Sequence, residues 1–184
     1  PLTISLISLP DHKPTRKLED NHLLKEKYDK LGLNHKEFFK VDIGDVALDG
    51  WMIKPVGFSA AKKYPLRFYV YGEPAGATVQ DVWDGNDLWH QYMAQQGFIV
   101  ISVDNRGTRA PRGKEWRNSI YRQIGILASE DQSKAALKIF TMFPFIDSAR
   151  VGIWGWSGGG QMTLNCMFRY PGIYKTGLAV SFVS

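Results

Sequence analysis

A short apolar run that turns abruptly into glycines constrains the fold of this chain more than any other feature. The run, Val151–Trp156, is followed by Ser157 and three glycines, and then by helical periodicity over residues 161–170. Gly155, Ser157 and Gly159 form the pattern Gly-x-Ser-x-Gly, which places a serine hydroxyl on a tight turn between a strand and a helix. Glycines are favoured there because the strand and the helix come too close for a Cβ atom. The sequence therefore predicts a strand, a strained turn at Ser157 and a helix.

The segments around this turn predict an α/β fold. Helical periodicity over residues 87–96 and 129–142 alternates with apolar runs at 66–71 and 98–103. Alternation of this kind is typical of a parallel sheet covered by helices, and a continuous apolar run is expected for a strand buried on both faces. We therefore expect a doubly wound sheet, in which Leu178–Val183 is a further strand with a neighbour on each side.

The N-terminal third carries less regular signals. In order, its residues predict a strand at 3–9, a polar linker at 12–20, a helix at 22–31 with Asn21 as N-cap, and a hairpin of strands 36–43 and 46–53. Phe39, Trp51 and Ile53 are expected on the inner face of this hairpin, and residues 147–150 are expected to form a turn before the Ser157 strand.

Composition and charge limit the classes of protein to consider. The chain has 184 residues, 44% of them hydrophobic, which is enough for one globular core, and no apolar run approaches the ~20 residues of a membrane span. Residues 105–122 hold six basic side chains and one acid, whereas the rest of the chain is neutral in sum. We interpret this segment as a basic loop paired with Glu130 and Asp131 rather than as a nucleic-acid interface. The single cysteine, Cys166, is expected to be a buried core residue.

Four motifs resemble, in order and spacing, the dipeptidyl peptidase IV branch of the prolyl oligopeptidase family of serine peptidases. They are Tyr69–Pro74, Asp104–Gly107, Glu130–Gln132 and Ile153–Gly159. The resemblance covers residues 18–184 and implies an incomplete α/β-hydrolase fold, with its later strands and helices and the family's β-propeller absent. Residues 1–17 would be the end of the propeller and the linker, and residues 18–184 the N-terminal portion of the catalytic domain.

The resemblance also implies a function. Enzymes of this branch release N-terminal dipeptides whose second residue is proline or alanine, through an acyl-enzyme and without a cofactor or metal. The implied partners are a peptide substrate, the upstream β-propeller, the missing C-terminal part of the catalytic domain and a second copy in a homodimer, with no nucleic acid. The implied location is the periplasm, the cell surface or the extracellular space.

Roles for individual residues combine chemistry with the resemblance. Ser157 is the predicted nucleophile, and the backbone N–H of Gly158, at the start of a helix, is a predicted donor to the oxyanion. Tyr71 matches the family tyrosine whose phenol supplies the second donor. Gly158 stands where many relatives have a tyrosine that lines the pocket for the proline-like side chain, so we expect that wall to be open here. Trp154 and Trp156 are expected to be core residues.

The catalytic triad is incomplete in this sequence. In an α/β-hydrolase the acid and the histidine follow the serine, but no Asp, Glu or His follows Ser157, and all four histidines precede it. We therefore expect this chain to be a piece of a longer peptidase, inactive by itself. Two alternatives remain open: an esterase or lipase of the same fold, and a non-catalytic truncated hydrolase module. Asp104 and Arg106 are expected to be structural ion-pair residues.

Overall fold

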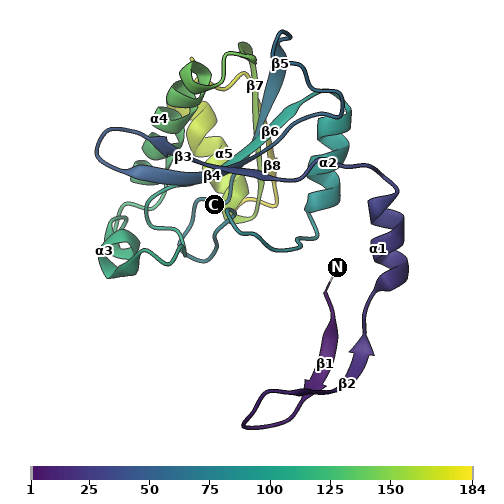
Figure 1. Cartoon of the computed structure of the whole chain (residues 1–184). Helices are drawn as coiled ribbons and strands as arrows, with labels where there is room; N and C mark the ends of the chain where they lie inside the picture. Colours follow the sequence, from purple (N-terminus) through teal and green to yellow (C-terminus); the bar gives the residue numbers. More distant parts are fainter. Residues whose placement is uncertain (1, 184) are drawn as a thin grey trace.

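A six-stranded mixed sheet runs through the computed structural model, which describes residues 2–183 (Figure 1). Its strands are β3 (Glu37–Asp42), β4 (Ala47–Ile53), β5 (Tyr64–Tyr69), β6 (Ile99–Asp104), β7 (Ile146–Trp156) and β8 (Thr176–Val180). They lie in the order β3-β4-β6-β5-β7-β8, and the last four in this order are parallel. The hairpin β3-β4 joins them antiparallel. This is the expected α/β class, with the predicted hairpin at one edge.

Helices cover both faces of the sheet (Figure 1). Helices α4 (Ile126–Met142) and α5 (Gly158–Arg169) lie on one face, and α2 (Asp87–Gln95) lies on the other, against β4 and β6. A short helix, α3 (Gly113–Asn118), interrupts the basic loop. The larger core cluster lies between the sheet and α4 and α5, and the smaller one lies beneath α2. Cys166 is in the larger cluster and is fully buried, as expected.

The apolar runs became strands for the expected reason. All six residues of β6 are buried, since the strand has β4 and β5 as neighbours and core clusters on both sides. In β5 the side chains alternate between the two faces: Leu66 and Phe68 face the larger cluster, while Arg67 and Tyr69 are half-buried on the α2 face. No helix among residues 2–183 is long and apolar enough to cross a membrane.

The prediction of one inner face for the hairpin was wrong. Trp51 and Ile53 belong to the cluster under α2, whereas Phe39 packs against the larger cluster on the opposite side. Phe39 pairs with Gly50 in the antiparallel register. Its side chain therefore lies on the face of the sheet to which residues 48 and 52 point, whereas Trp51 points to the opposite face. Strand β4 is buried on both faces, and its alternation therefore cannot mark one of them as the inside.

The predicted polar linker at 12–20 was also wrong. Residues Pro14–Glu19 form strand β2, which pairs antiparallel with β1 (Ile4–Ile7) as a two-stranded arm. Every residue of both strands is exposed, so no apolar alternation marked β2. Helix α1 (His22–Asp29) follows the arm and ends two residues before the expected position. Asn21 precedes it in a left-handed conformation and makes no side-chain capping bond.

Residues 147–150 lie within β7 rather than in a separate turn. Pro65 pairs with Asp147 and Leu66 with Val151, so the three residues between Asp147 and Val151 bulge out of the ladder. The residues that predicted a turn before the Ser157 strand therefore correspond to this bulge. Strand β8 ends at Val180, earlier than expected, and pairs with β7 on one side; among the described residues it has no second neighbour.

Candidate active site

Ser157 occupies the predicted turn between β7 and α5. Its φ of 55° and ψ of −120° lie in a region that residues with a side chain rarely adopt. The strained backbone is held from both sides: the N–H of Ser157 donates to the carbonyl of Val180 at 2.9 Å, and its carbonyl accepts from Gly160 at 2.8 Å. The turn is therefore fixed both to β8 and to the first turn of α5.

The glycines beside Ser157 are required by backbone contacts. A Cβ atom on Gly155 would overlap the carbonyl group of Gly159 and the carbonyl oxygen of Val70. A Cβ on Gly159 would overlap the same Val70 oxygen. Backbone atoms cannot move aside as a flexible side chain can, so the explanation given for the Gly-x-Ser-x-Gly pattern is confirmed.

The segment after β5 brings Tyr71 to this turn. The Cα of Tyr71 lies 3.2 Å from the position that a Cβ on Gly159 would take, and its ring lies over Gly76, 2.9 Å from the corresponding Cβ position there. Gly72 follows with a φ of +78°. Tyr71, Ser157 and the start of α5 thus lie together at the carboxyl end of the parallel strands, where ligands bind in open α/β sheets.

A buried hydrogen-bond chain ties this segment to the sheet. Asn105 donates from Nδ2 to the carbonyl of Gly72 at 3.1 Å, and its Oδ1 accepts from Nε2 of Gln132 at 3.0 Å. Gln132 also donates to the carbonyl of Val103 at 2.7 Å. We assigned no positioning role to Asn105 or Gln132 from the sequence, although both lie in the motifs that carried the resemblance. Asn105 directly follows the end of β6, which was the signal available for it, whereas Gln132 lies within α4.

Gly158 is the first residue of α5, so its N–H has no partner within the helix. This matches the geometry expected of an oxyanion donor. The wall beside Gly158 is not open, however, contrary to our expectation. A Cβ on Gly158 would overlap the carboxyl group of Glu73 and would lie 2.7 Å from its Oε1. The Glu73 carboxylate therefore occupies the space left by the absent side chain.

The ion pairs of the basic loop agree only in part with the sequence prediction. Arg106 binds the buried Asp131 and also the exposed Asp45, both with contacts of 2.7 Å. Glu130 instead pairs with Lys134, one turn along α4. Asp104 forms no ion pair among residues 2–183.

Asp104 instead accepts hydrogen bonds from the loop that follows Tyr71. Its carboxylate binds the backbone N–H groups of Thr78 and Val79 and the Thr78 hydroxyl. Burial raises the pKa of Asp104, and these hydrogen bonds oppose that shift. Asp104 is thus structural, as expected, but through hydrogen bonds.

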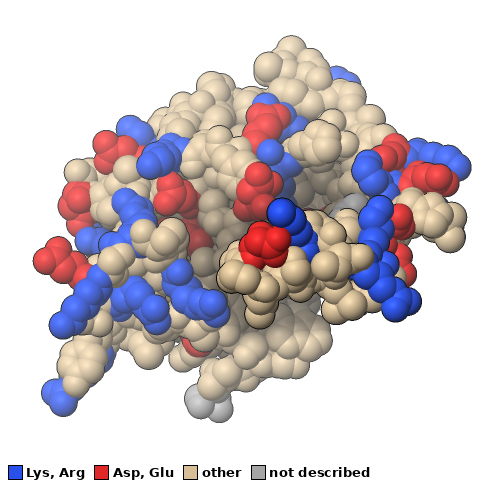
Figure 2. Space-filling model, turned by 60° about the horizontal axis from the view of Figure 1, so that its bottom comes forward, with Lys and Arg blue, Asp and Glu red and all other residues tan. Residues whose placement is uncertain are grey.

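Most of the basic loop remains in solvent. Lys and Arg side chains gather on the side of the molecule that carries α3 (Figure 2). Five basic residues of this loop are exposed: Arg109, Arg112, Lys114, Arg117 and Arg122. Arg112 stacks over Trp116, with its guanidinium carbon 4.1 Å from the ring centre.

His90 is the one buried histidine among the described residues, and no hydrogen bond joins it to Ser157. Its ring packs against Trp51, Tyr69 and Trp154, with centroids 4.7–5.8 Å apart. Burial lowers the pKa of His90 to about 4, so the ring is neutral near pH 7. Neither ring nitrogen has a hydrogen-bond partner among residues 2–183.

The two tryptophans just before Ser157 differ in burial. Trp154 is 7% exposed and belongs to the aromatic group around His90, as predicted. Trp156 is 59% exposed, so its assignment to the core was wrong. It lies at the carboxyl end of β7, directly before Ser157, where the helices no longer cover the strand.

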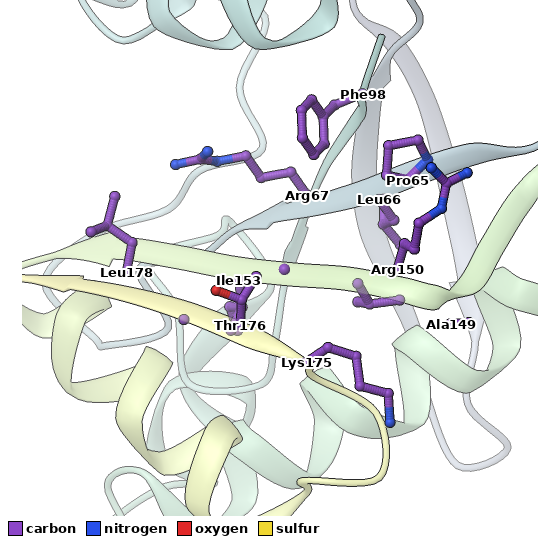
Figure 3. A pocket seen from close by; sticks show the side chains of 13 residues that line it. Pro65, Leu66, Arg67, Phe98, Ala149, Arg150, Ile153, Lys175, Thr176 and Leu178 are labelled. Atoms are coloured by element: carbon purple, nitrogen blue, oxygen red, sulfur yellow. The ribbon is translucent and has the colours of Figure 1, made fainter. Parts of the chain in front are cut away.

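One hollow among the described residues lies away from Ser157, which is not among its lining residues. A cavity of about 470 Å³ lies on the α2 side of β5, β7 and β8, beyond the edge of α2 (Figure 3). Arg67 and Phe98 line it on one side and Thr176 and Leu178 on the other. Arg67 stacks on Trp89 and Trp154 at 5.1 and 5.5 Å, and burial lowers its pKa. The hollow reflects a sheet face with no covering helix among the described residues.

Comparisons with known proteins agree with this geometry. The family model described as "Prolyl oligopeptidase family" matches residues 86–184, which include Ser157. Human "Prolyl endopeptidase FAP" is 37% identical over 168 residues, covering 91% of this chain and 22% of that protein. "Probable dipeptidyl peptidase 4" of Emericella nidulans is 36% identical over 183 residues, covering 97% of this chain and 23% of that protein.

A solved structure extends the similarity to three dimensions. The crystal structure of Porphyromonas gingivalis dipeptidyl peptidase 4 matches with a TM-score of 0.89 and 38% identity, over 98% of this chain and 25% of that one. The chain thus spans between a fifth and a quarter of the length of these relatives.

Proposed function

Because this chain belongs to the prolyl oligopeptidase family, we propose that it is the part of a serine peptidase that carries the nucleophile, Ser157. The observation that carries the proposal is the strained serine between β7 and α5, next to a free helix N-terminus and to Tyr71. A serine in this position presents its hydroxyl at the end of the sheet, which is the geometry of nucleophilic acyl transfer.

The reaction proposed is formation and hydrolysis of an acyl-enzyme. The Ser157 oxygen attacks the scissile carbonyl carbon and loses its proton to a base, and the carbonyl oxygen becomes an oxyanion. The N–H of Gly158 and the phenol of Tyr71 donate hydrogen bonds to that oxyanion. Collapse expels the amine, which takes the proton from the base, and water then releases the acid by the same steps.

The base and its acid partner are proposed to lie outside residues 1–184. Among residues 2–183 no histidine hydrogen-bonds to Ser157, and His90 is enclosed by aromatic rings. The length of the relatives supports this division, because they are four to five times as long as the part that matches.

The proposed substrates are peptides that lose an N-terminal Xaa-Pro or Xaa-Ala dipeptide. Support comes from the names of the relatives, which describe dipeptidyl peptidases and a prolyl endopeptidase. We further propose that the complete protein adds a β-propeller and the rest of the catalytic domain, forms a homodimer, and works in the periplasm or outside the cell.

The test uses the full-length protein. Wild type and Ser157→Ala are treated with a fluorophosphonate probe and assayed on Gly-Pro and Ala-Pro anilides and on acyl p-nitrophenyl esters. We expect stoichiometric labelling of Ser157, and a fall in kcat of about 10⁴–10⁶ in the variant. Ser148→Ala, in the exposed bulge of β7, is the matched control. A Ser157→Ala protein that keeps a tenth of its activity would contradict the proposal, and esterase activity alone would favour the esterase alternative.

A further inference from the structure

Glu73 is the charged side chain that the structure places against the proposed oxyanion donor. Its carboxyl group fills the space where a side chain at residue 158 would begin, and Oε1 lies 2.7 Å from that Cβ position. Gly158 directly follows Ser157, so an acyl group bound to Ser157 and the Glu73 carboxylate are neighbours. The negative charge of Glu73 would therefore lie close to the scissile bond of a bound peptide.

The backbone around Glu73 is fixed, so the position of the carboxylate is not that of a mobile surface side chain. The preceding carbonyl, of Gly72, accepts from the buried Asn105 at 3.1 Å. The carbonyl of Glu73 itself accepts from Gly76 at 3.3 Å, and the carbonyl of Gly76 accepts from Arg109 at 3.3 Å. The segment is thus tied to the sheet and to the loop after β6 at successive points.

The Glu73 carboxylate has no counter-charge among residues 2–183. It is half-buried, and it accepts no hydrogen bond and forms no ion pair within this part of the chain. Arg109 is joined to the same loop through its backbone, but its side chain is exposed and does not pair with Glu73.

An unpaired carboxylate beside an oxyanion site has a direct electrostatic consequence. Two negative charges within several ångströms repel each other, and partial burial strengthens the repulsion because water screens it less. The developing oxyanion is therefore disfavoured unless a cation lies close to Glu73. A substrate can supply that cation, and it is then preferred over a neutral substrate of the same shape.

We propose that Glu73 determines specificity by binding a cationic group of the substrate close to the scissile bond. This inference rests on the proposed function. The cation is an ammonium or guanidinium group on the side chain of the residue whose carbonyl is attacked, so Glu73 would extend the range of that residue beyond the proline and alanine proposed above. The same position disfavours an acidic side chain, because the carboxylate repels it.

The experiment compares four anilide substrates in the full-length enzyme. They are dipeptide anilides whose second residue is either lysine or norleucine, which share an unbranched stem, and each is used with a free and with an acetylated N-terminus. We expect the lysine substrate to exceed its norleucine match roughly tenfold in kcat/KM in wild type, and we expect Glu73→Gln to reduce that ratio to within about twofold. The lysine and norleucine pair reports the side chain, and the acetylated pair shows whether the N-terminal charge contributes to the ratio.

Controls separate this inference from the proposed function. Glu26→Gln removes an equal charge from the exposed helix α1, which follows the arm, and should leave the ratio unchanged (Figure 1). Glu73→Ala provides a second variant if Glu73→Gln does not fold, and in wild type the ratio should also fall several-fold between low and high salt.

The results distinguish a failure of this inference from a failure of the proposed function. Labelling of Ser157 with a charge ratio that is absent in wild type, or that persists in the Glu73 variants, would overturn this inference alone. Failure of Ser157 to label in wild type would overturn the proposed function together with it.

Discussion

Arg106 holds the fully buried carboxylate of Asp131 through three hydrogen bonds. Its Nη2 lies 2.7 Å from one oxygen, while its Nε and its backbone N–H each lie 3.0 Å from the other. Arg106 follows β6 and Asp131 lies in α4, so the pair joins the loop beside the active site to the helix behind the sheet. It also raises the pKa of Arg106, chiefly through the hydrogen bonds to Asp131.

Removing the charge of Asp131 should destabilise the protein strongly. Asp131→Asn leaves the guanidinium of Arg106 without its buried partner, and loss of one member of a buried pair costs about 3–5 kcal/mol. Asp45→Asn removes the exposed partner of the same arginine and should cost much less, because solvent screens that pair. Urea unfolding of both variants, followed by tryptophan fluorescence, measures the difference. Equal losses would show that burial of Asp131 does not set the strength of the pair.

A methyl group on Gly159 should prevent the turn at Ser157 between β7 and α5 from forming. The added Cβ would overlap the carbonyl oxygen of Val70, and neither backbone can retreat without breaking β5 or α5. We expect Gly159→Ala to lose more than about 3 kcal/mol or to fail to fold. Gly172→Ala, where a Cβ would meet nothing within 4 Å, should be close to neutral. Thermal unfolding of the two variants provides the comparison, and a stable, active Gly159→Ala enzyme would refute the packing argument.

Tyr71→Phe tests the proposed second oxyanion donor in the complete protein. Loss of the phenol should lower kcat by about 10²–10³ with little change in KM, the usual effect of removing one such donor. Tyr92→Phe, on the exposed side of α2, should have no effect. If kcat of Tyr71→Phe equals that of wild type, Tyr71 only supports the loop through its contact with Gly76.

His90 should make the stability of the protein depend on pH in the acid range. Its pKa is lowered from 6.5 to about 4 in the folded state by burial, so the unfolded chain takes up a proton first as the pH falls. The contribution is complete above pH 6.5 and is lost between about pH 6.5 and 4, by roughly 3 kcal/mol. His90→Phe should flatten this part of the stability profile, whereas a substitution of the exposed His12 should not. Identical profiles for wild type and His90→Phe would contradict the assignment.

Residues 1–184 expressed alone should associate and remain unlabelled by fluorophosphonates. Trp156, Leu178 and Phe182 are about half exposed near the free side of β8, and an unpaired strand edge invites pairing with another chain. Among the described residues only one face of β8 is covered, by α5. Size-exclusion chromatography tests the prediction, and Leu178→Lys should reduce association. A monomer that labels stoichiometrically would show that the base lies within these residues.

Two parts of the fold could be predicted from local sequence patterns alone. The Ser157 turn and β6 were predictable because backbone sterics and two-sided burial leave clear sequence signals. Strand β2 was not, since its residues are all exposed and only its partner makes it a strand.

The site itself was predictable only where a motif carried it. The place of Ser157 followed from glycine spacing, but the contact between Glu73 and Gly158 joins residues 85 positions apart in the sequence. No periodicity encodes such a contact. The open wall predicted at Gly158 failed for this reason: the absent side chain was visible in the sequence, and its replacement from another loop was not.

The hydrogen bond from the Ser157 N–H to Val180 has a consequence for how the protein is made. The ribosome adds residues in order, so the chain containing Ser157 emerges before its acceptor has been synthesised. The strained φ of Ser157 cannot be held by that bond until Val180 has left the exit tunnel and β8 has docked beside β7. During translation the serine is thus present before this hydrogen bond can hold it, and the bond forms only after β8 is in place.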